Sequence, residues 1–350
     1  MIESAPFVSV IINNFKNTNK LEVCLPSIQA SDYPCFEILV SDCVTSNIEN
    51  WIKSNFPEVK LIHFDEDIGP AASRNAGLSI SNSTSKYIVF VDNDTKMHPQ
   101  WLKNLVNSLE NDPKIGAAQP LLLKMNSTEK VDSYGGFFDR IGYACLPNLF
   151  SEQSNSIHTS DLDICYCEGV TILRRSILDN FQNLTAPYDS DYFQHWEDVD
   201  FCWEVMLSGY RVVLVTNSVV FHERGVSAGL GKQSSNLVFL NTRNRMTTLL
   251  KNYNLRNLTK YMPVLIFFEL SKALILFKTK KSHSISTLEG LFWNLKNIKS
   301  IWQKRMQVQF KVRKIGDSEI EKLLVKPSCA RLIKDFRRHY NQSLIKSTNN

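Results

Sequence analysis

The chain has 350 residues, 43% of them hydrophobic and 21% charged, which excludes a largely disordered protein and allows either one large α/β domain with an appendage or two domains. The net charge of +5 is unevenly distributed, because residues 241–350 hold 23 of the 40 Lys and Arg residues and 6 of the 35 Asp and Glu residues. We therefore expect an acidic front part and a basic C-terminal part suited to an anionic surface, either membrane or nucleic acid.

Strand-like and helix-like segments alternate along the front part. The expected strands cover residues 7–12, 36–42, 59–64, 87–94 and 115–123. The expected helices cover residues 21–30, 46–56, 70–79 and 99–110. This alternation predicts a parallel sheet.

The pattern is less regular after residue 130. Residues 134–158 are rich in Gly, Asn and Ser and indicate a long connection over an active site. The later elements are expected as a strand at 165–173, a helix through Leu207 that stops at Gly209, and short strands at 211–215 and 219–221.

The eight cysteines include no Cys-x-x-Cys pair, and we interpret them as reduced thiols of a cytosolic protein. The first apolar stretch is expected to be a strand and not a signal sequence.

Two acids, Asp92 and Asp94, follow directly after an apolar strand. Ligands bind at the carboxyl ends of strands in open α/β sheets, and Mg²⁺ is commonly held by one or two carboxylates together with substrate phosphates. The pattern therefore indicates a site for a metal-bound nucleotide diphosphate. The alternative is a surface turn in which these side chains bond to the local backbone.

The order of segments resembles the family 2 glycosyltransferases of the GT-A fold, which are inverting enzymes, and within them the rhamnosyltransferases. The matching segments are residues 8–12, 37–42, 69–77, 91–94 and 196–200, followed by His222. The resemblance spans residues 7–230 and implies transfer of a hexose or deoxyhexose from a nucleotide sugar.

The resemblance implies donor-binding roles for four residues. Asn13, Asp42 and Arg74 would contact the nucleotide, and Asp92 the region of the ribose and diphosphate. Arg74 lies among small residues, where backbone approaches a ligand closely and a guanidinium can form paired bonds to an anion. Arg74 as a surface arginine and Asp42 as a strand-end cap are the alternatives.

By the same resemblance, Asp94 would bind a divalent cation, Mg²⁺ or Mn²⁺. His222 would be a further ligand of the metal or of a phosphate. A histidine that follows an apolar strand is also common as a core or surface residue, and that alternative stays open for His222.

The acids at the start of the helix near residue 197 suit a catalytic base. Helix N-termini stabilise anions, so we expect a carboxylate there to stay ionised. Inverting transfer needs a base to take the proton of the acceptor hydroxyl. The family pattern assigns this role to Asp198, with Glu197 as a neighbour that could orient the base or the acceptor. Both could instead be helix-capping residues.

Some family features are absent or altered. Residues 13–15 and 42–45 differ from the usual sequences after the first two strands, which leaves the nucleotide base undefined. Residues 302–306 do not reproduce the Gln-x-x-Arg-Trp pattern of processive synthases, so we expect one sugar per encounter.

Residues 261–277 are apolar but interrupted by Glu269 and Lys272. A helix that crosses a membrane needs about 20 apolar residues. We therefore expect a basic helical region that lies on the cytoplasmic membrane surface. A helical cap on the catalytic domain and a dimer interface are the alternatives, and no recognised nucleic-acid module surrounds the basic clusters.

The sequence thus predicts an α/β GT-A domain over residues 1–240 with a mostly parallel sheet, followed by a basic helical region over residues 241–350. The expected partners are a nucleotide-sugar donor and a glycan or lipid-linked acceptor in cell-surface polysaccharide or glycoconjugate synthesis, with no nucleic acid. A nucleotidyltransferase that forms a nucleotide sugar and a silent membrane-associated scaffold of the same fold are the alternatives. The oligomeric state is not predicted.

Overall fold

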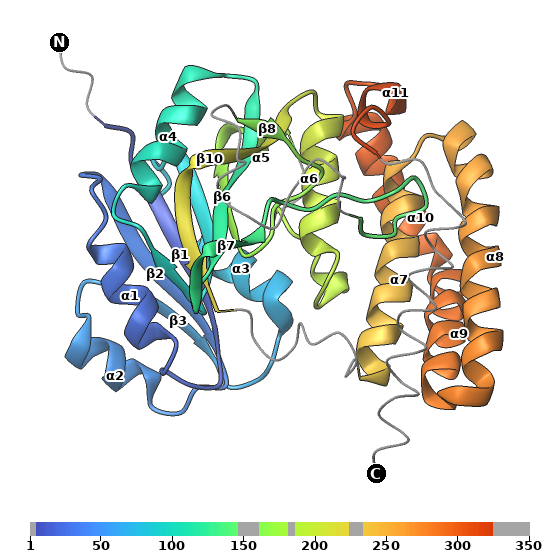
Figure 1. Ribbon diagram of the computed structural model, residues 1–350, viewed down its shortest axis with the longest axis horizontal. Coiled ribbons are helices and arrows are strands. Elements are labelled where there is room, and N and C mark those ends of the chain that lie inside the picture. Colours follow the sequence, from blue (N-terminus) through green and yellow to red (C-terminus); the bar gives the residue numbers. More distant parts are fainter. Residues whose placement is uncertain (1–4, 146–160, 181–185, 224–233, 325–350) are drawn as a thin grey trace.

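A computed structural model describes residues 5–145, 161–180, 186–223 and 234–324 (Figure 1). Its strands are β1 Val8–Phe15, β2 Phe36–Cys43, β3 Lys60–Phe64, β4 Tyr87–Asp92, β5 Thr95–Met97, β6 Ile115–Lys124, β7 Ser127–Ser133, β8 Leu162–Asp163, β9 Val170–Arg174 and β10 Arg211–His222. Its α-helices are α1 Leu21–Gln29, α2 Ile48–Asn55, α3 Gly69–Ser79, α4 Trp101–Asn111, α5 Ser176–Asn180, α6 Glu197–Leu207, α7 Ser235–Asn252, α8 Leu255–Thr279, α9 Lys281–Lys296, α10 Ile298–Gln307 and α11 Asp317–Ile320.

The central sheet has the strand order β3-β2-β1-β4-β9-β6-β10-β5. Parallel pairing joins β3 to β2, β2 to β1, β1 to β4, and β6 to β10. Strand β9 is antiparallel to both β4 and β6, and β5 is antiparallel to β10. Strands β1, β2, β3, β4, β6 and β10 therefore point in one direction, which confirms the expected mostly parallel sheet.

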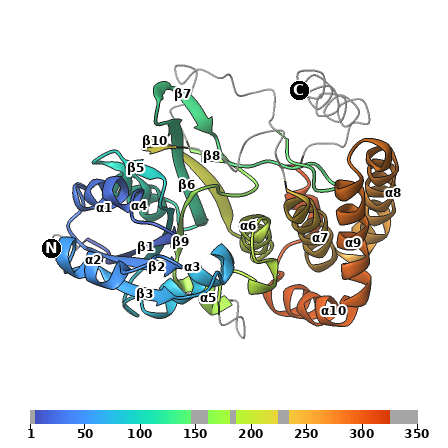
Figure 2. The same cartoon turned by 90° about the horizontal axis from the view of Figure 1, so that it is seen from below.

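Helices cover both faces of the sheet, as the end-on view shows (Figure 2). Strand β1 illustrates the cause, because Val10 faces the core formed with α1, α2 and α4, whereas Ile11 faces the core formed with α3, α5 and α6. Both side chains are fully buried, as expected of a strand between two helical layers. Helix α3 packs closely on β1 at Gly77, where a Cβ atom would lie 2.4 Å from Ile11 Cγ2.

Two expected elements differ from the structure. The strand expected at 165–173 begins only at Val170, because the backbone before it forms an isolated bridge between Tyr166 and Gly136. The two short strands expected after residue 210 are one strand, β10, with a shift of register between Val215 and Val219. Much of the expected 134–158 connection lies outside the described residues.

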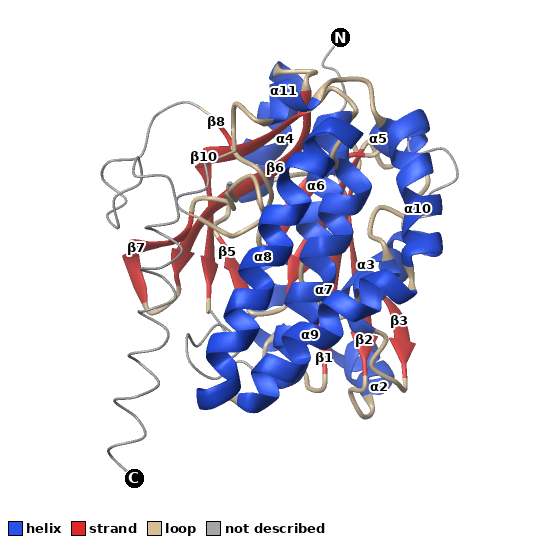
Figure 3. Ribbon diagram, turned by 90° about the vertical axis from the view of Figure 1, so that its right-hand side faces the viewer, coloured by secondary structure: helices blue, strands red, loops and turns tan. Residues whose placement is uncertain are grey.

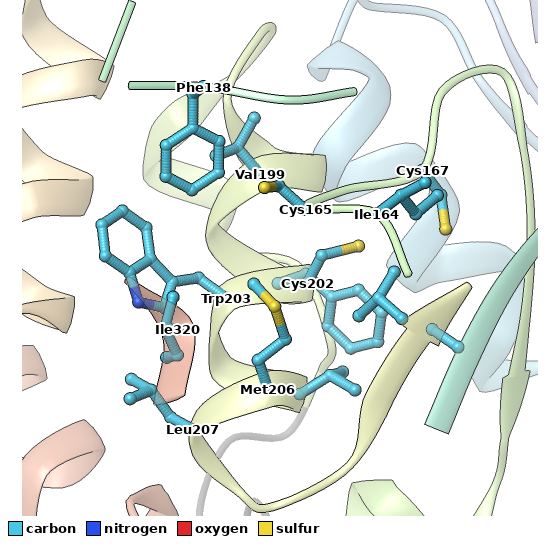
Figure 4. Close-up of a cluster of buried hydrophobic side chains, with 14 of the residues drawn as sticks. Phe138, Ile164, Cys165, Cys167, Val199, Cys202, Trp203, Met206, Leu207 and Ile320 are labelled. Atoms are coloured by element: carbon cyan, nitrogen blue, oxygen red, sulfur yellow. The ribbon is translucent and has the colours of Figure 1, made fainter. Parts of the chain in front are cut away.

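The C-terminal helices share a core with the sheet domain. Figure 4 shows Phe138 beside Trp203 of α6, with Ile320 of α11 next to the same ring. The ring centroids of Phe138 and Trp203 lie 5.0 Å apart. The same buried cluster extends through Leu249 of α7 and Leu265 of α8. Within the described part of the chain, no helix has the combined length and apolar content needed to cross a membrane.

Candidate active site

The predicted site residues gather where β1, β4 and β10 end. Asn13 lies opposite Asp92 in the parallel register of β1 and β4 and opposite Ser41 of β2. His222 is the last residue of β10, where it pairs with Thr95 of β5. The topology therefore brings residues far apart in sequence to the carboxyl edge of the sheet, where open α/β sheets bind ligands.

Arg74 joins two of the predicted acids. Its guanidinium donates to Asp92 Oδ1 at 2.8 Å and to Glu197 Oε1 at 3.0 Å, and it lies over the ring of Tyr188 at 5.4 Å from the centroid. Arg74 is buried, and the nearby carboxylates raise its pKa despite an opposing effect of desolvation. The alternative of a surface arginine is therefore wrong. Arg74 connects the end of β4 to the beginning of α6.

A second pair is formed by Asp94 and His222. The distance from Asp94 Oδ1 to His222 Nε2 is 3.2 Å, and His222 Nδ1 lies 2.8 Å from Asp132 Oδ2 on β7. Desolvation lowers the pKa of His222, but its bonds to Asp132 and Asp94 outweigh this and raise it to about 10. His222 is therefore neither a core residue nor a surface residue without partners.

The side chains of Asp94 and His222 fit a divalent cation that is also bound by the phosphates of a substrate. Binding of a cation would displace the proton from Nε2 of His222, while Asp132 accepts the hydrogen bond from the N–H at Nδ1, so that Nε2 can act as the metal-binding nitrogen. Gly169 leaves space beside this atom, since a Cβ there would lie 4.0 Å from His222 Nε2 and 3.9 Å from Asp92 Oδ2. The described residues contain no group of three or more metal-binding side chains. Two protein ligands suit Mg²⁺ or Mn²⁺ when phosphate oxygens supply further positions.

Asp42 is fully buried and already bonded within the protein. Its Oδ1 accepts from Asn14 at 2.5 Å and from Thr45 at 2.6 Å, and its Oδ2 lies 2.7 Å from His63 Nδ1. Asp42 therefore holds together the ends of β1 and β2, and a contact with the nucleotide stays a prediction.

Glu197 and Asp198 begin α6 with different environments. Glu197 is buried and bonds Arg74 through Oε1, whereas its Oε2 is buried without a hydrogen-bond partner among the described residues. Asp198 is partly exposed, and its Oδ1 accepts from the backbone N–H of Val199 at 2.7 Å. Burial and the charge of Glu197 raise the pKa of Asp198 well above its ordinary value, against the effects of Arg74 and of the Val199 N–H. Burial and the charge of Glu197 thus oppose the effect of the helix dipole on the pKa of Asp198. A raised pKa makes its carboxylate a stronger base once the proton is lost.

The loop before α6 has a strained backbone that α7 holds in place. Phe193, His195 and Trp196 all have positive φ angles, between 59° and 74°, which are uncommon outside glycine. The side chain of Asn244 donates to the carbonyls of Tyr192, Gln194 and His195 at 3.0, 3.0 and 2.7 Å. The C-terminal helical region therefore fixes the position of the first turn of α6, which carries Glu197 and Asp198.

Sequence reasoning missed Asp132, Tyr188 and Asn244. Asp132 lies on a polar edge strand without a recognisable motif, and Tyr188 precedes the acidic helix by several residues. Asn244 is far from the site along the chain, in a helix interior. A polar residue in the buried interior of a helix was the one available signal, because buried side-chain amides need hydrogen-bond partners.

Comparisons with known proteins bear on the family and the fold of the chain. Residues 9–180 match the model of "Glycosyl transferase family 2". The segment 9–180, just under half of the chain, is therefore similar to the family that the sequence motifs indicated. The structure described as the crystal structure of GalNAc-T7 with UDP, GalNAc and Mn²⁺ has a TM-score of 0.56 at 15% identity, covering 85% of this chain and 58% of that chain. This likeness establishes a fold of the GT-A type.

Curated relatives match over shorter stretches. Glycosyltransferase AglE of Haloferax volcanii is 30% identical over 115 residues, which are 31% of this chain and 37% of that protein. Uncharacterized glycosyltransferase YibD of Escherichia coli is 30% identical over 117 residues, 32% of this chain and 33% of that protein. Pre-mycofactocin glycosyltransferase of Mycobacterium tuberculosis is 22% identical over 167 residues, 47% of this chain and 32% of that protein. The matches thus span about a third of each of these relatives.

Proposed function

We propose that this protein transfers one sugar from a nucleotide-sugar donor to an acceptor hydroxyl, with inversion at the anomeric carbon. The observation that carries the proposal is the meeting, at one sheet edge, of the Arg74 network and the Asp94–His222 pair. The first provides donor-binding and base-positioning groups, and the second suits a cation that holds a diphosphate.

In the proposed reaction, Asp198 takes the proton of the acceptor hydroxyl as its oxygen attacks the anomeric carbon. The bond from that carbon to the donor phosphate breaks, and the nucleoside diphosphate leaves. Mg²⁺ or Mn²⁺ bound by Asp94 and His222 would neutralise the charge that develops on the diphosphate. Arg74 holds Asp92 on the donor side and Glu197 beside the base, so it would align the two halves of the reaction.

The remaining details of the proposal rest on family resemblance and on the basic helical region. We propose a hexose or deoxyhexose as the sugar and a glycan or lipid-linked acceptor as the substrate that receives it. The pathway would be synthesis of cell-surface polysaccharide or glycoconjugate at the cytoplasmic face of a membrane. Two of the relatives are named as glycosyltransferases, which supports glycosyl transfer as the reaction class.

The test is turnover of a panel of UDP-, GDP- and dTDP-sugars with Mg²⁺ or Mn²⁺, comparing the wild type with Asp198→Asn. We expect turnover of one donor that falls at least a hundredfold in the variant, while binding of that donor is retained. Equal turnover by the variant would refute the role of Asp198. Donor binding without turnover, with every donor and with lipid-linked acceptors supplied, would instead support the silent scaffold.

A further inference from the structure

Helix α8 exposes a continuous apolar stripe. Phe267, Leu270, Leu274 and Phe277 are 67%, 48%, 76% and 56% exposed. Their spacing of three, four and three residues places them on one side of the helix. The opposite side, which includes Leu265 and Ala273, is buried against the rest of the protein.

Helix α9 repeats the same arrangement. Ile285, Leu288, Phe292 and Leu295 are 42%, 44%, 66% and 63% exposed and have the same spacing. Figure 3 shows α8 and α9 next to each other in front of α7, on the side of the molecule away from the sheet. We call these eight exposed residues of the two helices the α8–α9 face. Large apolar side chains that are exposed together on neighbouring helices point to an interaction site.

The exposed charges around the α8–α9 face are mostly positive. Lys278, Lys281, Lys296 and Lys299 are exposed near the ends of the two helices, and Glu289 is an exposed acid on α9. The other acid of this pair of helices, Glu269, is buried and bonded to Arg245 and Lys272. Apolar stripes flanked by lysines are the features by which helices bind the interface of an anionic bilayer.

We propose that the α8–α9 face binds the surface of an anionic lipid bilayer, with both helices parallel to the membrane plane. A second copy of the chain fits this face less well. In a two-fold dimer the same surface meets itself, so the lysines would approach one another. Lysine is also depleted in the cores of protein interfaces. Anionic head groups instead neutralise the lysines while the acyl region takes up the phenylalanine and leucine side chains.

The position of the α8–α9 face links it to the proposed reaction. Figure 1 shows the turn between α8 and α9 at the lower end of the molecule, where α7 also begins and toward which β10 runs at its end. A bilayer on this face would lie on the far side of α8 and α9 from the sheet, so an acceptor held at the lipid surface would reach the site around the end of the molecule that carries the turn between these helices. This link rests on the proposed function, whereas the binding of lipid does not.

The test is sedimentation of the full chain with vesicles of phosphatidylcholine, alone or with phosphatidylglycerol added. We expect binding to the phosphatidylglycerol vesicles that weakens about thirtyfold in the double variant Lys278→Gln and Lys281→Gln. The double variant Leu274→Ser and Phe292→Ser should weaken binding at least about tenfold. The double variant Val23→Ser and Lys53→Gln, which changes exposed residues of α1 and α2, is the matched control and should bind like the wild type.

Failure to bind either vesicle, or equal binding by all variants, would overturn the proposal. A concentration-dependent dimer that is lost in the Leu274→Ser and Phe292→Ser variant would assign the face to self-association instead. Donor turnover without vesicles is measured in parallel. It should be the same in all these variants, so that a failure of the lipid proposal is separated from a failure of the proposed function.

Discussion

Replacing Arg74 with methionine should destabilise the protein through the charge that it leaves behind. Arg74 bonds Asp92, whose side chain is 32% exposed, and Glu197, whose side chain is 7% exposed. Breaking a buried ion pair costs about 3–5 kcal/mol, whereas exposed pairs contribute about 0–1 kcal/mol. Since solvent can reach Asp92 but not Glu197, we expect Arg74→Met to lower the free energy of unfolding by about 3 kcal/mol, most of it from Glu197.

A double-mutant cycle in urea unfolding tests this reasoning. Glu197→Gln removes the unpaired charge, so the double variant should regain about 1–2 kcal/mol relative to Arg74→Met alone. Donor binding, measured by calorimetry, should stay weak in the double variant because the guanidinium is still missing. A cost below about 1 kcal/mol for Arg74→Met, together with no coupling to Glu197→Gln, would refute the account of the network.

Three further outcomes follow from the same geometry. Asp132→Asn should lower the affinity for Mn²⁺, measured through nucleoside diphosphate binding, about 10- to 100-fold, because Asp132 orients His222. An unchanged Mn²⁺ titration would contradict this. The kcat/KM of the wild type should rise with pH through the raised pKa of Asp198, because only the deprotonated carboxylate acts as a base. A midpoint of this pH profile near the ordinary carboxyl pKa of about 4 would speak against Asp198 as the base. Asn244→Asp removes the amide donors to the loop before α6, so it should lower kcat about tenfold or more with little change in the KM for the donor. Asn241→Asp on the same helix is the control and should leave both constants unchanged. Equal effects of the two variants would exclude a positioning role for Asn244.

The sheet was predictable because its strands carry local signals. The apolar run of β1 and the acids after β4 follow from side-chain pattern alone, and the alternation with helices sets the direction of the strands. The reversed strand β9 was not predictable, since nothing in residues 170–174 distinguishes a strand inserted antiparallel between β4 and β6 from a parallel one.

The site was predictable in its residues but not in their contacts. Asp94 and His222 could be named from the family resemblance, yet the bond of His222 to Asp132 depends on the course of β7 along the sheet edge. The raised pKa of Asp198 could not be predicted from the sequence, because the helix dipole is a local effect, whereas desolvation and the charge of Glu197 depend on tertiary packing. Similarly, the hydrogen bonds from Asn244 of α7 to the loop before α6 could not be predicted from the sequence.

The most direct test of the central claim is calorimetric binding of UDP, GDP and dTDP to the wild type and to Asp94→Ala, with and without Mn²⁺. The account predicts that one nucleoside diphosphate binds the wild type in the presence of Mn²⁺, and that this binding is lost on chelation and in Asp94→Ala. Binding that is indifferent both to the cation and to Asp94 would contradict a cation-held diphosphate at this edge of the sheet.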